Sequence, residues 1–176
     1  MEKNIEIAKE CGFTNAGVLS VDTMVVKKEV RDMCEMNTCQ KYGKNWACPP
    51  ACGELDECEK KLRKFSKGII VQQTGQLEDS MDIEGLDELD KAYKASFKKA
   101  VERFSELYPN MLPLAAGPCL LCKECTYPDK DCRFPDKRVS SMESFGLVVN
   151  EVCKANDLPY NYGPNTMTYV GCFLFE

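Results

Sequence analysis

Apolar residues recur at helical spacing over the longest regular stretch of the chain. The repeat begins near Ile83 and continues to Tyr108, where Pro109 ends it because proline cannot continue a helix. The pattern therefore predicts one long helix over residues 83–108. The apolar positions that carry it are Leu86, Leu89, Tyr93, Phe97, Ala100, Val101, Phe104 and Leu107.

Shorter apolar runs, rich in β-branched and aromatic residues, separate the helical segments. They predict strands at residues 13–20, 69–74, 112–116 and 168–175. Strands that alternate with helices favour an α/β fold. We expect one sandwich domain over residues 1–176, with a small mixed sheet of about four strands.

The remaining helices are expected to be short. Apolar spacing predicts them at residues 5–11, 26–34 and 55–65. Ser140 and Glu143 form a capping-box pattern, which predicts that another helix begins there.

Composition and charge restrict the class of function. The net charge is −5 and the pI is near 5.0, whereas nucleic-acid binding requires clustered Lys and Arg. No apolar run reaches the roughly 18 residues needed to span a bilayer, and the N-terminus lacks the apolar stretch of a signal peptide. We therefore expect a cytoplasmic protein that binds neither nucleic acid nor membrane.

The cysteine content points to metal. The chain has 12 Cys and no His, and reducing compartments keep thiols from forming a disulfide framework. The lack of histidine excludes mixed Cys/His zinc sites and the usual Cys–His and Ser–His catalytic pairs. No catalytic residue can be assigned from the sequence.

The most specific motif lies in the second half of the chain. Cys119, Cys122 and Cys125 are separated by two residues each, and Cys132 and Pro135 follow. Four thiolates at this spacing are typical of iron–sulfur ligation, although in ferredoxins the fourth Cys comes sooner and directly precedes proline. Zinc is the alternative metal, since thiolates also bind it.

A second, less regular set of cysteines precedes this motif. Cys39, Cys48 and Cys52 surround a stiff Pro49-Pro50 segment, and Gly53 allows a tight turn. We predict a second metal site here, with Cys34 as the fourth ligand. Cys58 is the alternative fourth ligand, but it lies on the apolar face of a helix and is expected to be a core thiol.

Three more cysteines fall in predicted helices or strands and are expected in the core. They are Cys11, Cys153 and Cys172.

These motifs together resemble a family described as predicted metal-binding protein, whose members have no assigned reaction. The resemblance implies metal binding, and the abundance of the family in anaerobic bacteria and methanogens implies oxygen-labile iron–sulfur chemistry. It covers nearly the full length. It is carried by Cys39, Tyr42-Gly43, Trp46-Ala47-Cys48-Pro49-Pro50, Cys52-Gly53, the CxxCxxC run, Cys132-Arg133, Pro135, Ser141-Met142-Glu143 and Gly146.

Two classes of function follow. The first is an iron–sulfur protein with one or two 4Fe-4S clusters, which transfers electrons to a redox partner protein or reduces a small-molecule substrate. The second is a zinc-stabilised interaction module without redox activity. The sequence identifies neither the substrate nor the oligomeric state.

Overall fold

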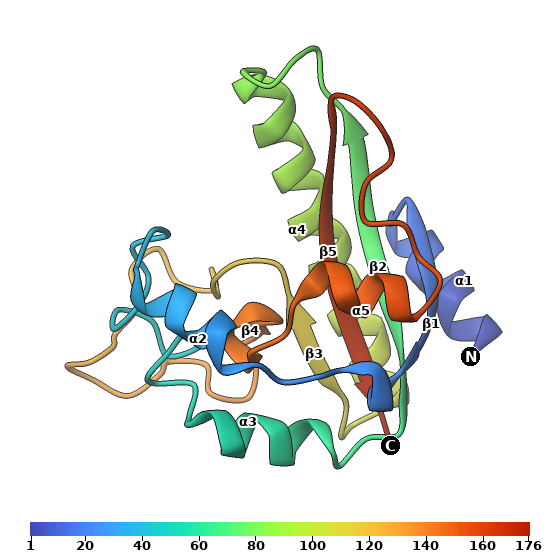
Figure 1. Ribbon diagram of the computed structural model, residues 1–176. Coiled ribbons are helices and arrows are strands. Elements are labelled where there is room, and N and C mark those ends of the chain that lie inside the picture. Colours follow the sequence, from blue (N-terminus) through green and yellow to red (C-terminus); the bar gives the residue numbers. More distant parts are fainter.

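The computed structural model describes residues 1–176 and has a five-stranded mixed sheet at its centre (Figure 1). The strand order is β1-β2-β5-β3-β4, and every neighbouring pair is antiparallel except β3 and β4. The predicted α/β class is confirmed, with one strand more than expected. The strands are β1 (Asn15–Ser20), β2 (Lys67–Gln76), β3 (Leu112–Ala115), β4 (Ser140–Ser141) and β5 (Thr166–Phe175).

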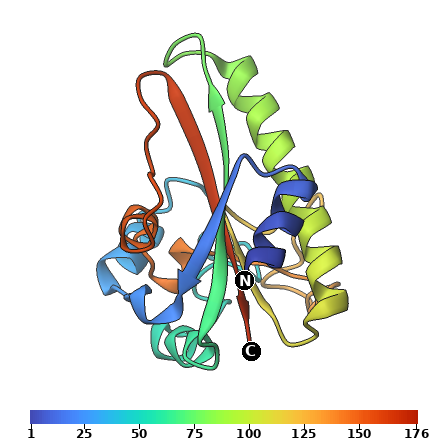
Figure 2. The ribbon, with the colours of Figure 1, turned by 90° about the vertical axis from the view of Figure 1, so that its right-hand side faces the viewer.

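Helices cover both faces of the sheet. Figure 2 shows α1 (Glu2–Cys11) and α4 (Ile83–Leu107) on one face and α2 (Lys28–Glu35), α3 (Leu55–Leu62) and α5 (Val149–Ala155) on the other. Two separate apolar clusters fill the space between these helices and the sheet. The sheet is thus buried on both sides, which explains the apolar stretches Ile69 to Val71 in β2 and Val170 to Phe175 in β5.

Successive side chains of β5 point to opposite faces of the sheet and therefore belong to different apolar clusters. Phe173 and Phe175 belong to the cluster under α1 and α4, whereas Cys172 and Leu174 belong to the opposite one. The Phe97 ring on α4 stacks on Phe173 at 4.8 Å between centroids. Burial of such aromatic rings is the main source of stability on this face.

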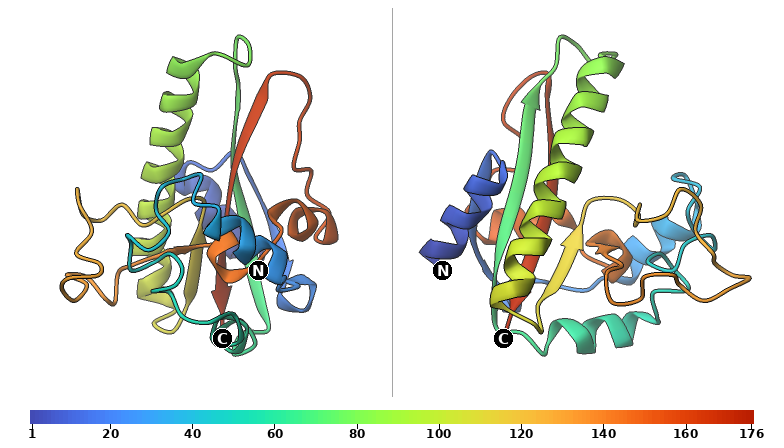
Figure 3. Two further views of the ribbon diagram at one scale, coloured as in Figure 1. Left: turned by 60° about the vertical axis from the view of Figure 1, so that its left-hand side comes forward. Right: turned by 180° about the vertical axis from the view of Figure 1, so that it is seen from behind.

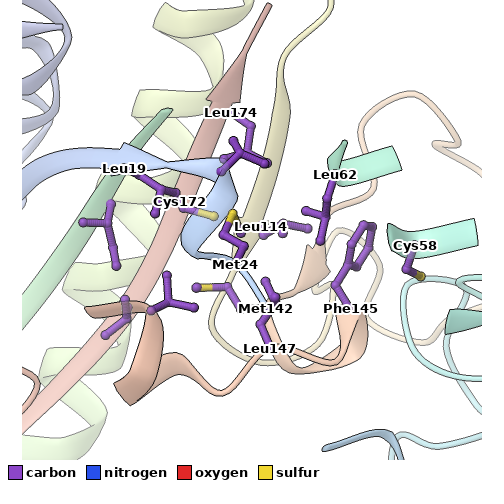
Figure 4. Close-up of a cluster of buried hydrophobic side chains, with 14 of the residues drawn as sticks. Leu19, Met24, Cys58, Leu62, Leu114, Met142, Phe145, Leu147, Cys172 and Leu174 are labelled. Carbon is purple, nitrogen blue, oxygen red and sulfur yellow. The ribbon is translucent and has the colours of Figure 1, made fainter. Parts of the chain in front are cut away.

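The second cluster joins α3, α5 and the segment around Met142 to the sheet. Figure 4 shows Met142 and Leu147 packed near Met24 and Leu114. Cys172 and Cys153 are fully buried here, and Cys11 is buried on the opposite face, so the predicted core positions of these three thiols are confirmed.

None of the helices combines the length and apolar character that crossing a lipid bilayer requires.

Two predicted helices differ from those observed. No helix begins at Ser140, since Ser140 and Ser141 pair with β3, only a 3-10 turn (Glu143–Phe145) follows, and α5 starts at Val149. The helix expected over residues 26–34 is observed as α2, with bounds shifted by one or two residues, but its apolar face is incomplete, because Val30 is buried whereas Met33 is 58% exposed. Pairing with β3 outweighs the local capping signal in the first case.

Both cysteine-rich segments leave the same side of the molecule. Figures 1 and 3 show the first cysteine loop (residues 36–54) beside the second (residues 117–138), beyond the β3 and β4 edge of the sheet. The first loop connects α2 to α3, and the second connects the parallel strands β3 and β4. Segments far apart in the sequence are therefore brought together at one end of the fold.

Candidate metal centre

The second loop surrounds a cavity of about 280 Å³. All four predicted ligands, Cys119, Cys122, Cys125 and Cys132, line it, and all four are partly exposed. The first loop forms the opposite wall through residues 40–41 and 44–47. The cysteines that the sequence grouped by spacing therefore face one common space.

Hydrogen bonds hold the two loops together. The Asn45 side-chain amide donates to the Cys119 carbonyl at 3.0 Å, and the Trp46 backbone N–H donates to Cys125 Sγ at 3.5 Å. Trp46 Nε1 also donates to the Lys130 carbonyl at 3.0 Å. Asn45 is buried and its Oδ1 accepts from the Ala47 N–H at 2.9 Å, which fixes the side chain. Asn45 and Trp46 are therefore the residues that position the second loop.

Aromatic and cationic contacts add to this junction. The Tyr127 ring meets Trp46 edge-on at 4.9 Å, and the Arg138 guanidinium lies 5.9 Å from the Trp46 ring centre. Such contacts each contribute about 0.5–1.5 kcal/mol. No pattern in the sequence indicated the structural roles of Asn45 and Arg138. Trp46 carried one usable signal, since it is the only tryptophan of the chain and lies within a cysteine loop.

Cys48 is the first-loop thiol that faces both loops. It is buried, and burial raises the pKa of its thiol to about 12, with further rises from the neighbouring Cys39, Cys34, Cys119 and Cys125. Burial also raises the pKa of Cys34. Thiols with raised pKa values stay protonated near neutral pH, so a metal ion must displace protons in order to bind them.

Cys52 pairs with Cys58 deeper in the fold. Both are buried in the cluster that contains Phe145, and Figure 4 shows the Cys58 sulfur turned away from that ring. A hydrogen bond between the two thiols raises the pKa of Cys52 and lowers that of Cys58 to about 7. The Arg31 guanidinium donates to Cys58 Sγ at 3.4 Å and to the Gly53 carbonyl at 3.0 Å. The expected core position of Cys58 is confirmed, and the ligand role of Cys52 stays a prediction.

The eight predicted ligands are thus distributed unevenly. The second-loop set shares one cavity, Cys34 and Cys39 both contribute to the raised pKa of Cys48, and Cys52 lies with Cys58. No three cysteine or carboxylate side chains are gathered in the arrangement that holds a metal ion. The assignment of these residues as ligands stays a prediction.

Comparison with known families bears on the chemistry of these loops. A family model described as Predicted metal-binding protein (DUF2284) matches residues 17–175. The chain belongs to this family. The match includes both loops of this DUF2284 protein and all strands of its sheet except the first two residues of β1. No curated protein and no solved structure matches the chain.

The donor set fits a soft metal centre. The second loop of the DUF2284 protein offers four thiols and no imidazole to one cavity. Thiolates are the ligands of iron–sulfur clusters and of all-cysteine zinc sites, whereas Mg²⁺ and Ca²⁺ require oxygen donors. The metal-binding character of the family therefore agrees with the side chains present.

Proposed function

We propose that this DUF2284 protein is an iron–sulfur protein that transfers electrons. The second loop would hold a 4Fe-4S cluster through Cys119, Cys122, Cys125 and Cys132. The observation that carries the proposal is that all four thiols line one cavity, and that the first three are separated from each other by two residues. When bound, the cluster would supply one-electron chemistry.

The spacing of Cys119, Cys122 and Cys125 favours a cluster over zinc, and the surroundings of Cys125 suit a centre held by thiolates. The Cys125 sulfur accepts a hydrogen bond from the Trp46 N–H, and hydrogen bonds to ligand sulfurs are one of the features that set cluster potentials. The cavity wall also carries Lys44 and Arg138, whose positive charges favour an anionic centre of thiolates and sulfides.

The first loop would hold a second cluster through Cys34, Cys39, Cys48 and Cys52. Support comes from the segment Cys48-Pro49-Pro50-Ala51-Cys52, in which two prolines stiffen the backbone between two of these thiols. Two centres held by adjoining loops would allow an electron to pass from one to the other, while one centre alone would serve for storage or for reduction of a small molecule.

Anaerobic purification tests the proposal. We expect a brown protein with broad visible absorption from charge transfer between sulfur and iron, and with iron and acid-labile sulfide in near-equal amounts. Electron paramagnetic resonance after reduction would identify the cluster type. A colourless protein with stoichiometric zinc and no sulfide, even after reconstitution, would favour the zinc-stabilised interaction module instead.

A further inference from the structure

Cys122 occupies a distinct place among the second-loop thiols. It lines the internal cavity together with Cys119, Cys125 and Cys132, but it alone of the four also lines an open groove on the outer surface. A centre held by this loop would approach solvent at the Cys122 side. Because electron transfer slows steeply with distance, this side is where an electron would enter or leave.

The groove beside Cys122 has apolar and charged walls. Leu121 and Phe134 form the apolar part and are 48% and 43% exposed, while Lys123 and Arg133 provide positive charge against the single carboxylate of Glu124. The adjacent Leu120 is 53% exposed. Exposed apolar side chains gathered within a polar rim are typical of a protein–protein interface.

The charge of this region opposes that of the whole chain. Five cations and a single carboxylate, that of Glu124, line the cavity, although the net charge of the protein is −5. None of the five takes part in any of the six ion pairs of the structure. Two of them, Lys123 and Arg133, also line the outer groove, where their charge is available to a partner. The five cations are Lys41, Lys44, Lys123, Arg133 and Arg138.

We propose that this surface, the Cys122 face (residues 120–124 and 133–134), docks an acidic electron-transfer protein. The inference rests on the proposed function. Opposite charge would steer the partner toward the face, and Leu121 and Phe134 would make the close contact. In the step itself one electron leaves the reduced centre of one protein and reduces the oxidised centre of the other, and no bond or proton is transferred.

A second basic surface gives a matched control. Lys60, Arg63 and Lys64 lie together on and after α3, but Asp56 and Glu59 share that surface and Arg63 pairs with Glu59 at 3.2 Å. Cationic residues alone therefore do not distinguish the Cys122 face. Its unpaired cations, exposed apolar side chains and accessible ligand thiol occur together there.

Binding to an acidic probe protein tests the docking surface without requiring redox activity. Plant-type ferredoxin would be titrated into the metal-loaded full chain at low ionic strength, with cytochrome c as a basic probe. We expect saturable binding of ferredoxin that weakens with salt, and no such binding of cytochrome c. Lys123→Glu should weaken ferredoxin binding by about tenfold, and Lys60→Glu, which changes the charge equally, by less than about twofold.

Phe134→Ser tests the apolar contact, with Ile83→Ser at another exposed apolar position as its control. We expect Phe134→Ser to weaken ferredoxin binding and Ile83→Ser to leave it unchanged. Metal content and circular dichroism would establish that each variant is folded and loaded. Equal losses in Lys123→Glu and Lys60→Glu, or no ferredoxin binding by folded, loaded protein, would overturn the docking surface. Metal analysis that finds zinc would instead overturn the redox function, so the two failures are distinguishable.

Discussion

The two cysteine loops differ in what the fold does with their thiols. In the first loop, Cys48 and Cys52 are buried, and Cys52 belongs to an apolar cluster of the sheet. In the second loop, all four cysteines remain partly exposed around a cavity, and none of them belongs to either apolar cluster. Burial can stabilise the first loop, whereas the second has little packing of its own. The second loop should therefore depend more strongly on metal.

Removal of the metal should give the largest effect, because it should destabilise the second loop far more than the first. The binding free energy of structural metal in small peptides is on the order of 10 kcal/mol, and much of it would offset the entropy cost of ordering the second loop. After chelation we expect rapid tryptic cleavage at Lys123 and Lys130, while Lys98 within α4 stays protected. Mass spectrometry of the fragments provides the measurement. Equal protection of the second loop with and without metal would contradict the contrast between the loops.

Cys122→Ala should destabilise the protein more than Cys153→Ala. The first change removes a predicted ligand, and several kcal/mol of metal-binding free energy would be lost with it. The second removes a buried core thiol that accepts a hydrogen bond from Gln72 Nε2 at 3.7 Å, at a cost of about 1 kcal/mol. Thermal unfolding and metal content of the two variants would be compared. Identical melting temperatures and metal contents would refute the ligand role of Cys122.

Cys48→Ser tests whether the two loops hold separate metal sites. If each loop holds a cluster, bound iron should fall by about half, because the second-loop set would remain intact. Iron analysis and the visible spectrum of the anaerobic variant give the result. Loss of nearly all iron would mean that the loops share one cluster, and unchanged iron would make the first loop purely structural.

Trp46→Phe should have the smallest effect. The substitution removes the hydrogen bond from Trp46 Nε1 to the Lys130 carbonyl and weakens the contact with Tyr127, but it keeps the backbone N–H that donates to Cys125. The expected loss of stability is about 1–2 kcal/mol. Denaturant unfolding of the metal-loaded variant would measure it. A loss no greater than that of Phe65→Leu, at a partly buried position away from both loops, would argue against a special role for the Trp46 junction.

Regular elements were the easiest to predict from the sequence. The long helix was expected at residues 83–108 and is observed at Ile83–Leu107, because its apolar repeat is long and ends at Pro109. The strands expected at residues 69–74 and 168–175 extend by a few residues in the structure. Both are central strands whose apolar stretches, Ile69 to Val71 and Val170 to Phe175, are buried, so burial and local propensity agree there.

Contacts between distant segments could not be predicted. Ser140 and Glu143 had a local capping signal, but pairing of β4 with β3 decided their conformation. The cysteines of the second loop were recognisable from spacing alone. The roles of Asn45 and Trp46 could not be recognised in this way, because their hydrogen bonds to the second loop connect residues 74 to 84 positions apart in the sequence.

The parallel pairing of β3 with β4 has a consequence for metal affinity. Parallel neighbours need a long crossover connection, usually a helix, and here residues 116–139, which include the second loop, take that place. The sheet hydrogen bonds already hold the two ends of this segment together. Closing a free chain of that length would cost about 3 kcal/mol of conformational entropy. The same cysteine segment, excised as a linear peptide, should therefore bind its metal about a hundredfold more weakly than it does between its two strands.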